Sequence, residues 1–131
     1  MTITAFNLGG GSKGKLVLML SAVGCTKAYE HQGMTIPFAD NKYVDGNGYV
    51  LRPFKAAFVI SANASQDRDA HTITINLSKN GNAIYTNTFW DNWYAWRTYT
   101  GMHDFAAGDR ISLTTYREYT YSMGCCVIYK I

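Results

Sequence analysis

The feature that most constrains the fold of this chain is the long stretch from Gly48 to Ile131, which reads as strands and turns with almost no helical pattern. Its clearest segment is 72–77, where isoleucine and leucine alternate with threonine and asparagine at the period of two that a half-buried strand requires. Asn80 and Gly81 follow as a tight-turn signal. The pattern also predicts strands at 54–60, 83–89, 110–115 and 125–131.

Further turn signals divide this stretch into short segments. Asp45-Gly46-Asn47-Gly48 precedes it, and Ala107-Gly108-Asp109 interrupts its second half. Turns spaced by about eight to twelve residues are typical of two packed antiparallel sheets. We therefore predict an all-β fold, an antiparallel jelly-roll sandwich of about eight to ten strands.

The N-terminal part divides into two. Residues 1–15 contain three consecutive glycines and are expected to form a flexible arm with a glycine-rich linker. Residues 16–23 are a continuous apolar run, too short to span a bilayer and typical of a fully buried strand. The predicted organisation is an arm at 1–15 and a single domain at 16–131.

Composition favours strands and a covered surface. Only 16% of the 131 residues are charged, against about a quarter in an ordinary soluble domain. The chain has 10 tyrosines, 6 phenylalanines and 3 tryptophans, residue types that suit strands and, for tyrosine, interfaces. Its surface is therefore expected either to be rich in uncharged polar groups or to be partly covered by a partner.

The charges and cysteines exclude several functions. The net charge is +3 and no basic run is present, so we expect no nucleic-acid partner. The three cysteines, Cys25, Cys125 and Cys126, lack the spacing of metal ligands. Neighbours in a strand point to opposite faces, so no disulfide is expected between Cys125 and Cys126. Buried free thiols, in a protein that folds in a reducing cytosol, are the preferred interpretation.

Two N-terminal motifs suggest chemistry that we do not expect. Residues 9–15 match the first seven positions of a phosphate-binding loop, but the eighth is Leu16 instead of the serine or threonine that binds Mg²⁺. Residues 13–25 resemble a bacterial lipoprotein signal with Cys25 as the lipidated residue. Ala22 fits poorly at its position in that signal, so a buried strand is preferred and no membrane anchor is expected.

No catalytic or metal-binding motif is visible. His31, His71 and His103 are far apart in sequence, and no zinc site is expected from them. The aspartates at 67 and 69 do not complete a calcium loop. No serine lies in a nucleophile-elbow motif. We predict a protein without cofactor, metal or enzymatic activity.

The segment 90–105 is the densest in aromatic residues. If it is one extended strand, one face carries Trp90, Tyr94 and Trp96 and the other carries Trp93 and Tyr99. An exposed platform of this kind binds sugar rings, and Arg97 and His103 lie near enough in sequence to add polar contacts. The alternative, which we favour, is that these aromatic residues lie in the core or between protomers.

Three motifs occur in the order found in one known group of proteins. They are Gly48-Tyr49 with Pro53 and Phe58-Val59-Ile60-Ser61, then Ile75 with Lys79-Asn80-Gly81, then 105–113 with its Gly108-Asp109 turn, followed by an apolar final strand. Over residues 34–131 the chain resembles the C1q/TNF-like jelly-roll superfamily. The resemblance implies a ten-stranded jelly roll that forms a homotrimer, with one sheet around the three-fold axis and the final strand central in it. Candidates for the trimer interface are Tyr116, Tyr129, Trp93 and Tyr99.

From these observations we expect a non-enzymatic structural protein of a virus particle, namely a trimeric bacteriophage capsid decoration protein. The absence of a disulfide framework and the short arm favour this over a secreted signalling protein. The arm would dock on the capsid through Phe6, Leu8, Lys13 and Lys15. The alternative is a carbohydrate- or receptor-binding module, at a phage tail tip or outside a cell, that uses the Trp/Tyr-rich segment 90–105.

Overall fold

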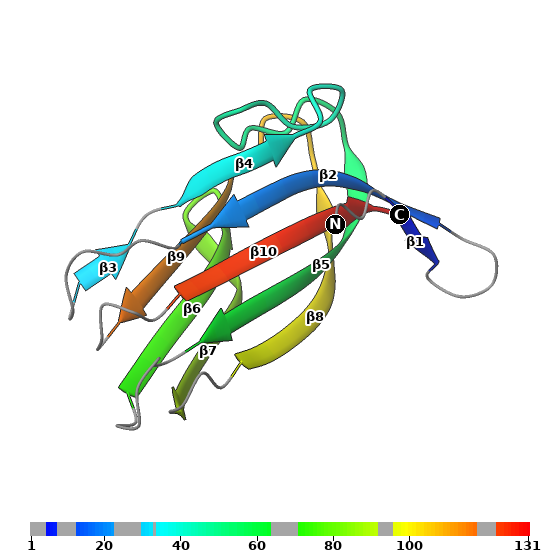
Figure 1. Cartoon of the computed structure of the whole chain (residues 1–131). Helices are drawn as coiled ribbons and strands as arrows, with labels where there is room; N and C mark the ends of the chain where they lie inside the picture. Colours follow the sequence, from blue (N-terminus) through cyan, green and yellow to red (C-terminus); the bar gives the residue numbers. More distant parts are fainter. Residues whose placement is uncertain are drawn as a thin grey trace.

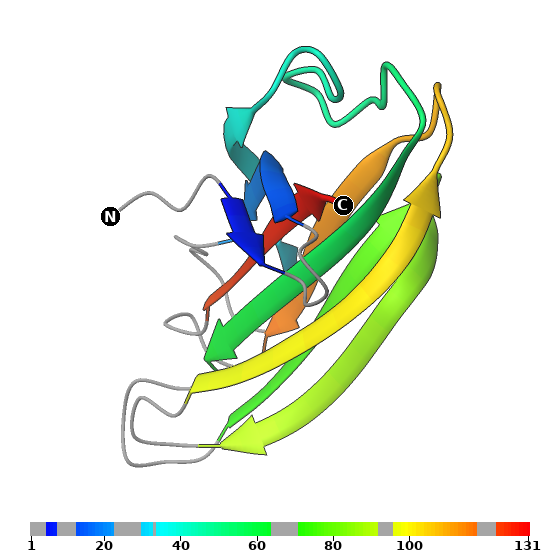
Figure 2. The same ribbon diagram turned by 90° about the vertical axis from the view of Figure 1, so that its right-hand side faces the viewer.

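The computed structural model describes residues 5–7, 13–22, 30–32, 34–63, 71–91, 96–117 and 123–131, and within them it consists of two antiparallel β-sheets packed face to face (Figures 1 and 2). Sheet A contains β1 (Ala5–Asn7), β2 (Lys13–Ser21), β4 (Thr35–Ala39), β5 (Phe54–Asn63), β8 (Trp96–Phe105) and β10 (Met123–Lys130). Sheet B contains β3 (Glu30–Gln32), β6 (His71–Lys79), β7 (Asn82–Asp91) and β9 (Ile111–Arg117).

The strand order is that of a jelly roll. Sheet A runs β1-β2-β10-β5-β8, with β4 also paired to β2, and sheet B runs β3-β9-β6-β7. After the β6–β7 hairpin the chain passes back and forth between the sheets, so that β8, β9 and β10 belong to A, B and A in turn. The final strand lies between β2 and β5, in the middle of its sheet. The predicted all-β antiparallel jelly-roll sandwich is confirmed.

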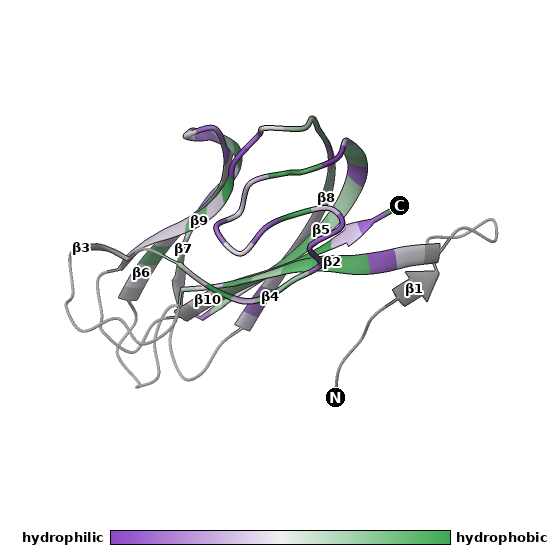
Figure 3. Ribbon diagram, turned by 90° about the horizontal axis from the view of Figure 1, so that it is seen from above, coloured by the Kyte–Doolittle hydropathy of each residue, from purple (hydrophilic) through white to green (hydrophobic). Residues whose placement is uncertain are grey.

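The core lies between the two sheets and follows the period-two pattern. Ile73, Ile75 and Leu77 on β6 are fully buried, as the alternation in 72–77 predicts. They pack in one cluster with the inward residues of sheet A, which include Phe58 and Ile60 on β5. Figure 3 shows the apolar stretches of β2 and β5 within the layered ribbon.

Two predicted turns are present for clear physical reasons. Asn80 and Gly81 both adopt positive φ, 54° and 81°. Two consecutive residues of positive φ form the tight two-residue turn of a β-hairpin, here the one that joins β6 to β7. Gly48 has φ 88°, and a Cβ there would lie 2.5 Å from the main-chain oxygen of Ile111. The Asp45 carboxylate accepts hydrogen bonds from two amides of the same turn. The turn lies directly against the start of β9, where the Ile111 amide donates to the Gly48 carbonyl.

The first long strand begins earlier than expected. β2 starts at Lys13 and ends at Ser21, whereas the apolar run predicted a strand at 16–23. Lys13 and Lys15 pair with Asn7 and Ala5 of β1, so these parts of the expected arm form a hairpin in sheet A.

Candidate functional site

The outward face of sheet A, which points away from sheet B, is the candidate functional surface. The strand register aligns its side chains in three consecutive rows across β2, β10, β5 and β8. The rows are Leu16, Tyr129, Ala57 and Met102; then Met19, Val127, Val59 and Thr100; then Ser21, Cys125, Ser61 and Thr98. We call this set the uncharged face.

None of the side chains in these rows carries a charge, and the first two rows are almost entirely apolar. Met102 is 61% exposed, and Phe38 on β4, which pairs with Met19, is 39% exposed. Leu16, Ala57 and Tyr129 are buried even though they lie outside the core cluster between the sheets. The outward face of an antiparallel sheet is usually polar when it contacts water, and an uncharged outward face is typical of an interaction surface.

A β-bulge in β2 places Leu16 beside Tyr129 on this face. The pairing of β10 with β2 shifts between Ile128 and Tyr129, where Val17 is the extra residue. Tyr129 therefore lies beside Leu16 and Ala57, on the uncharged face.

The other residues predicted for the trimer interface are not among the rows of the uncharged face. Tyr116 is on β9 of sheet B, where Leu113 and Thr115 alternate inward, so its side chain faces the opposite outer surface from Tyr129. Tyr99 points inward, with its ring 5.6 Å from that of Tyr85, and helps to close the edge between β7 and β8, which lie side by side in Figure 2. Trp93 is outside the described residues.

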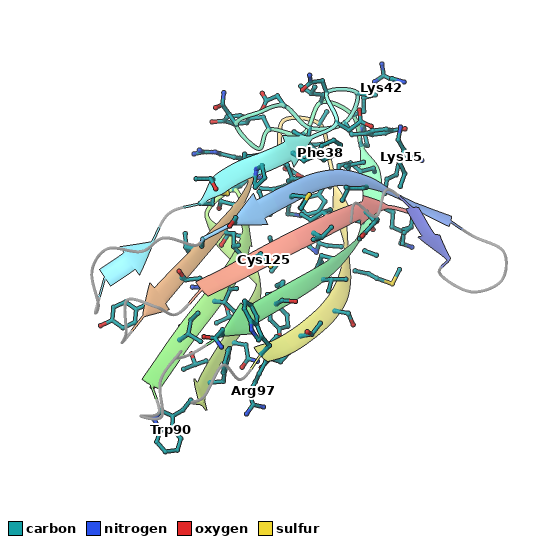
Figure 4. The ribbon with its side chains drawn as sticks, in the orientation of Figure 1. Lys15, Phe38, Lys42, Trp90, Arg97 and Cys125 are labelled. Carbon is teal, nitrogen blue, oxygen red and sulfur yellow. The ribbon has the colours of Figure 1, made fainter. Side chains whose placement is uncertain are left out.

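The prediction that Trp90 and Trp96 share a face of one strand is wrong. Trp90 ends β7 in sheet B and Trp96 begins β8 in sheet A, so the chain changes sheet between them. Both are exposed, at 67% and 51%, but on the outer surfaces of different sheets (Trp90 is labelled in Figure 4). Tyr94, the third member of that predicted platform, is outside the described residues.

The polar residues expected near this platform alternate with Trp96 along β8, and Arg97 is exposed at the end of that strand. Arg97 lies with its guanidinium 5.5 Å from the centre of the Phe89 ring. His103 has its ring 5.2 Å from that of Phe105, and among the described residues its buried Nε2 has no hydrogen-bond partner. Neither side chain lies on the face that carries Trp96.

Lys15, expected to dock on a capsid, lies in a basic end of the molecule that Figure 4 shows beside Lys42. Its Nζ is 3.1 Å from Asp40 Oδ2 and 6.0 Å from the centre of the Tyr43 ring. The pKa of Asp40 is lowered, chiefly by the hydrogen bond from the Lys42 amide and further by Lys15. Of the other arm residues, Phe6 lies in β1 and Lys13 in β2, whereas Leu8 is outside the described residues.

The described residues offer little reactive chemistry. Cys125 and Cys126 are free thiols on opposite faces of β10, and burial raises the pKa of both. A nucleophilic thiol needs a lowered pKa, so neither is poised to react. Across the described ranges there is no cluster of three or more histidine, cysteine or acidic side chains that would hold a metal ion. The same ranges contain no helix of the length and apolarity needed to cross a membrane. Cys25 is outside them.

Comparison with known proteins rests on structure alone, because no protein-family model and no curated protein matches the sequence. The crystal structure of murine APRIL at pH 8.0 superposes with a TM-score of 0.54 and 13% identity, over 88% of this chain and 98% of that chain. A second crystal structure of murine APRIL, at pH 8.5, gives 0.53 with the same identity and coverage. This chain has a C1q/TNF-like jelly-roll fold. The globular domain of zebrafish complement 1qA matches with a TM-score of 0.49 and 13% identity, over 89% of this chain and 98% of that chain.

The fold implied by the sequence motifs is therefore confirmed. Identity of 13% carries the fold and no activity, so the role of the protein has to be argued from its own surface.

The uncharged face could have been found in the sequence. Three of its four strands, β2, β5 and β10, contain continuous apolar runs, 16–20, 56–60 and 125–129, in which both alternating sets of residues are apolar. Such runs are typical of strands covered on both faces.

Proposed function

We propose that this protein is a non-enzymatic binding or structural module that works as a homotrimer, with the uncharged face of sheet A between its subunits. The observation that carries the proposal is the three consecutive rows without a charged side chain. Exposed apolar patches of this kind mark interaction sites, and the centres of subunit interfaces are depleted of charge. The 16% charged composition of the whole chain agrees with a surface that is partly covered.

Self-association is favoured because the outward face of sheet A has buried side chains on its central strands and exposed apolar side chains on its edge strands. Tyr129 and Ala57 at the centre are already buried by their neighbours, whereas Met102 and Phe38 project at the edges. An exposed apolar edge of this kind on one copy can pack against the corresponding face of the next. Repeated around an axis, such head-to-tail contacts close into a ring, and three copies are what the fold implies.

Val127 gives the sharpest test, since it lies in the middle row on the central strand β10. In Val127→Lys a charge enters the interface without a partner, which costs several kcal/mol for each subunit. We expect the variant to sediment as a folded monomer, with association weakened by at least about a hundredfold. The matched control is Ala83→Lys, at an exposed position on β7 of sheet B, which should stay trimeric. A trimeric Val127→Lys protein would place the interface elsewhere.

The setting that we propose for this trimer is a virus particle, as a capsid decoration protein whose arm contacts the shell. The support is the low charge of the chain; the hairpin in which β1 pairs with Lys13 and Lys15 would be the part of the arm that faces the shell from the edge of sheet A. Murine APRIL and zebrafish complement 1qA are animal proteins, so the virion setting rests on this chain alone. Deleting residues 1–12 tests it: incorporation into particles should be lost while the trimer stays intact.

A second candidate function, binding of a glycan or a receptor, is favoured by the exposure of Trp90 and Trp96. Each ring offers a face on which a sugar can stack. We expect Trp90→Ala or Trp96→Ala to abolish binding on a glycan array without changing the sedimentation of the trimer. A wild-type protein that binds no glycan on the array would remove this candidate in its carbohydrate form.

A further inference from the structure

A groove of about 460 Å³ lies at the edge of the sandwich between β4 of sheet A and β9 of sheet B. Its volume is within the range of about 300–1,000 Å³ found for small-ligand sites. The lining residues are Met34, Ile36, Gly46, Asn47, Arg110, Ser112, Leu113 and Thr114. None of them belongs to the uncharged face, so the groove is separate from the proposed subunit interface.

The chain opens this groove by leaving sheet B early. β3 pairs with β9 only as far as Gln32 and Thr115, after which the chain crosses to β4 in sheet A. The main-chain N–H of Leu113 is left without a strand partner and donates to Met34 Sδ at 3.2 Å. Leu113 itself is fully buried, so Met34 covers this amide and forms part of the groove wall above it.

Arg110 is held in place at the end of the groove. Its guanidinium lies 5.4 Å from the centre of the Tyr49 ring, and its Nε donates to the Asn47 carbonyl at 3.4 Å. Stacking and one hydrogen bond through Nε orient the guanidinium, so its two terminal nitrogens stay available to a ligand. Among the described residues no carboxylate lies within ion-pair distance of it.

The acidic side chains next to Arg110 in space or sequence are already engaged. Asp45 accepts hydrogen bonds from the amides of its own turn. Asp109 accepts from the Ala106 amide and the Asn80 side chain. The lining itself contains one cation, the polar side chains of Ser112, Thr114 and Asn47, and no acid.

We propose that this groove binds a small organic acid, with its carboxylate on Arg110 and its short apolar chain against Met34 and Ile36. Charge and shape both favour this class. A planar guanidinium matches a carboxylate through paired hydrogen bonds, and an apolar floor with a few convergent donors is the usual composition of a small-ligand site.

Hexanoate and its neutral counterpart hexanamide are the probes, followed by NMR of the full chain. We expect hexanoate to shift the amide signals of Leu113, Ser112 and Thr114 and to bind at least about tenfold more tightly than hexanamide. Arg110→Gln should weaken hexanoate about tenfold. The matched control is Arg97→Gln, since Arg97 also stacks on an aromatic ring, at 5.5 Å. It should bind hexanoate like the wild type.

Three results would overturn the site: no hexanoate shifts in the groove, equal binding of the two probes, or equal weakening by Arg110→Gln and Arg97→Gln. Arg110→Lys retains the charge and should bind more tightly than Arg110→Gln. If Arg110→Gln does not fold, the comparison of hexanoate with hexanamide on the wild type and on Arg110→Lys still decides. Sedimentation of the same samples reports separately on the trimer.

Discussion

Gly101 allows β8 to pack closely against the core, and its replacement by alanine makes a quantitative prediction. It lies on the inward side of β8, directly opposite Phe58 of β5. A Cβ at this position would lie 2.4 Å from Phe58 Cζ and 2.9 Å from Cε2. The Gly101 backbone has no positive φ, so the cost of Gly101→Ala is steric and not conformational.

The magnitude follows from how firmly Phe58 is held. Its side chain is 4% exposed, and its ring packs edge-on against Tyr85 with centroids 6.0 Å apart, so it cannot turn out into water. Overpacking of a core costs about 1–3 kcal/mol. Alanine in place of glycine returns roughly 0.5–1 kcal/mol in a strand because the unfolded chain loses entropy. Because the new Cβ would lie only 2.4 Å from Phe58 Cζ, the steric cost falls in the upper part of that range, and we expect Gly101→Ala to lower the free energy of unfolding by about 1–2 kcal/mol.

Two other glycines serve as comparisons. In Gly124→Ala the new Cβ would meet Ile75 Cδ1 at 2.7 Å, the mobile end of a side chain, so a smaller loss is expected. Gly46 has no atom within 4 Å of such a Cβ, and Gly46→Ala should change stability by less than about 0.5 kcal/mol.

The assay is urea unfolding followed by tryptophan fluorescence, at one fixed protein concentration because association shifts the transition. A double-mutant cycle with Phe58→Leu isolates the contact, and its coupling energy should be at least about 1 kcal/mol. The reasoning would be refuted if Gly101→Ala were as stable as Gly46→Ala. It would also fail if the cycle showed no coupling.

Three further predictions concern the turns and thiols. Gly48→Ala should cost more than Gly101→Ala in the same urea assay, because Gly48 combines φ 88° with a main-chain oxygen 2.5 Å from the new Cβ; a neutral variant would contradict this. The pKa of Asp109 is lowered, chiefly by the hydrogen bond from the Ala106 amide and further by that from the Asn80 side chain. Asp109 therefore stabilises the fold at any pH above its ordinary pKa of 3.8, and this stabilisation is lost as the pH falls through the lower pKa of the folded state. The stability difference between wild type and Asp109→Asn should therefore shrink in acid, and a constant difference would count against the assignment. In a Cys25→Ser background, mass spectrometry should find Cys125 alkylated slowly and Cys126 only after unfolding, because burial raises the pKa of both and Cys126 is fully enclosed; equal rates in the folded protein would be inconsistent with this placement.

The parts of the fold that depend on local chemistry were predictable from the sequence. The alternation in 72–77 fixes which side of β6 is buried, and Asn80-Gly81 supplies the two positive φ angles that its hairpin needs. The final strand lies at the centre of its sheet, as the resemblance of the motifs implied.

The features that depend on distant pairing were not predictable. The segment 90–105 carries aromatic residues throughout, so its residue pattern did not reveal the change of sheet that separates Trp90 from Trp96. The groove brings Asn47 to Arg110, which are 63 positions apart, and no sequence pattern connects them. The rows of the uncharged face likewise depend on the register between four strands, although the apolar runs on three of them, β2, β5 and β10, were visible.

The most direct test of the proposed trimer is the solution mass of the wild-type protein, measured by sedimentation equilibrium near neutral pH and at micromolar concentration. The uncharged face predicts three times the chain mass of 14.6 kDa. A monomer of 14.6 kDa with Met102 and Phe38 left in water would contradict the account.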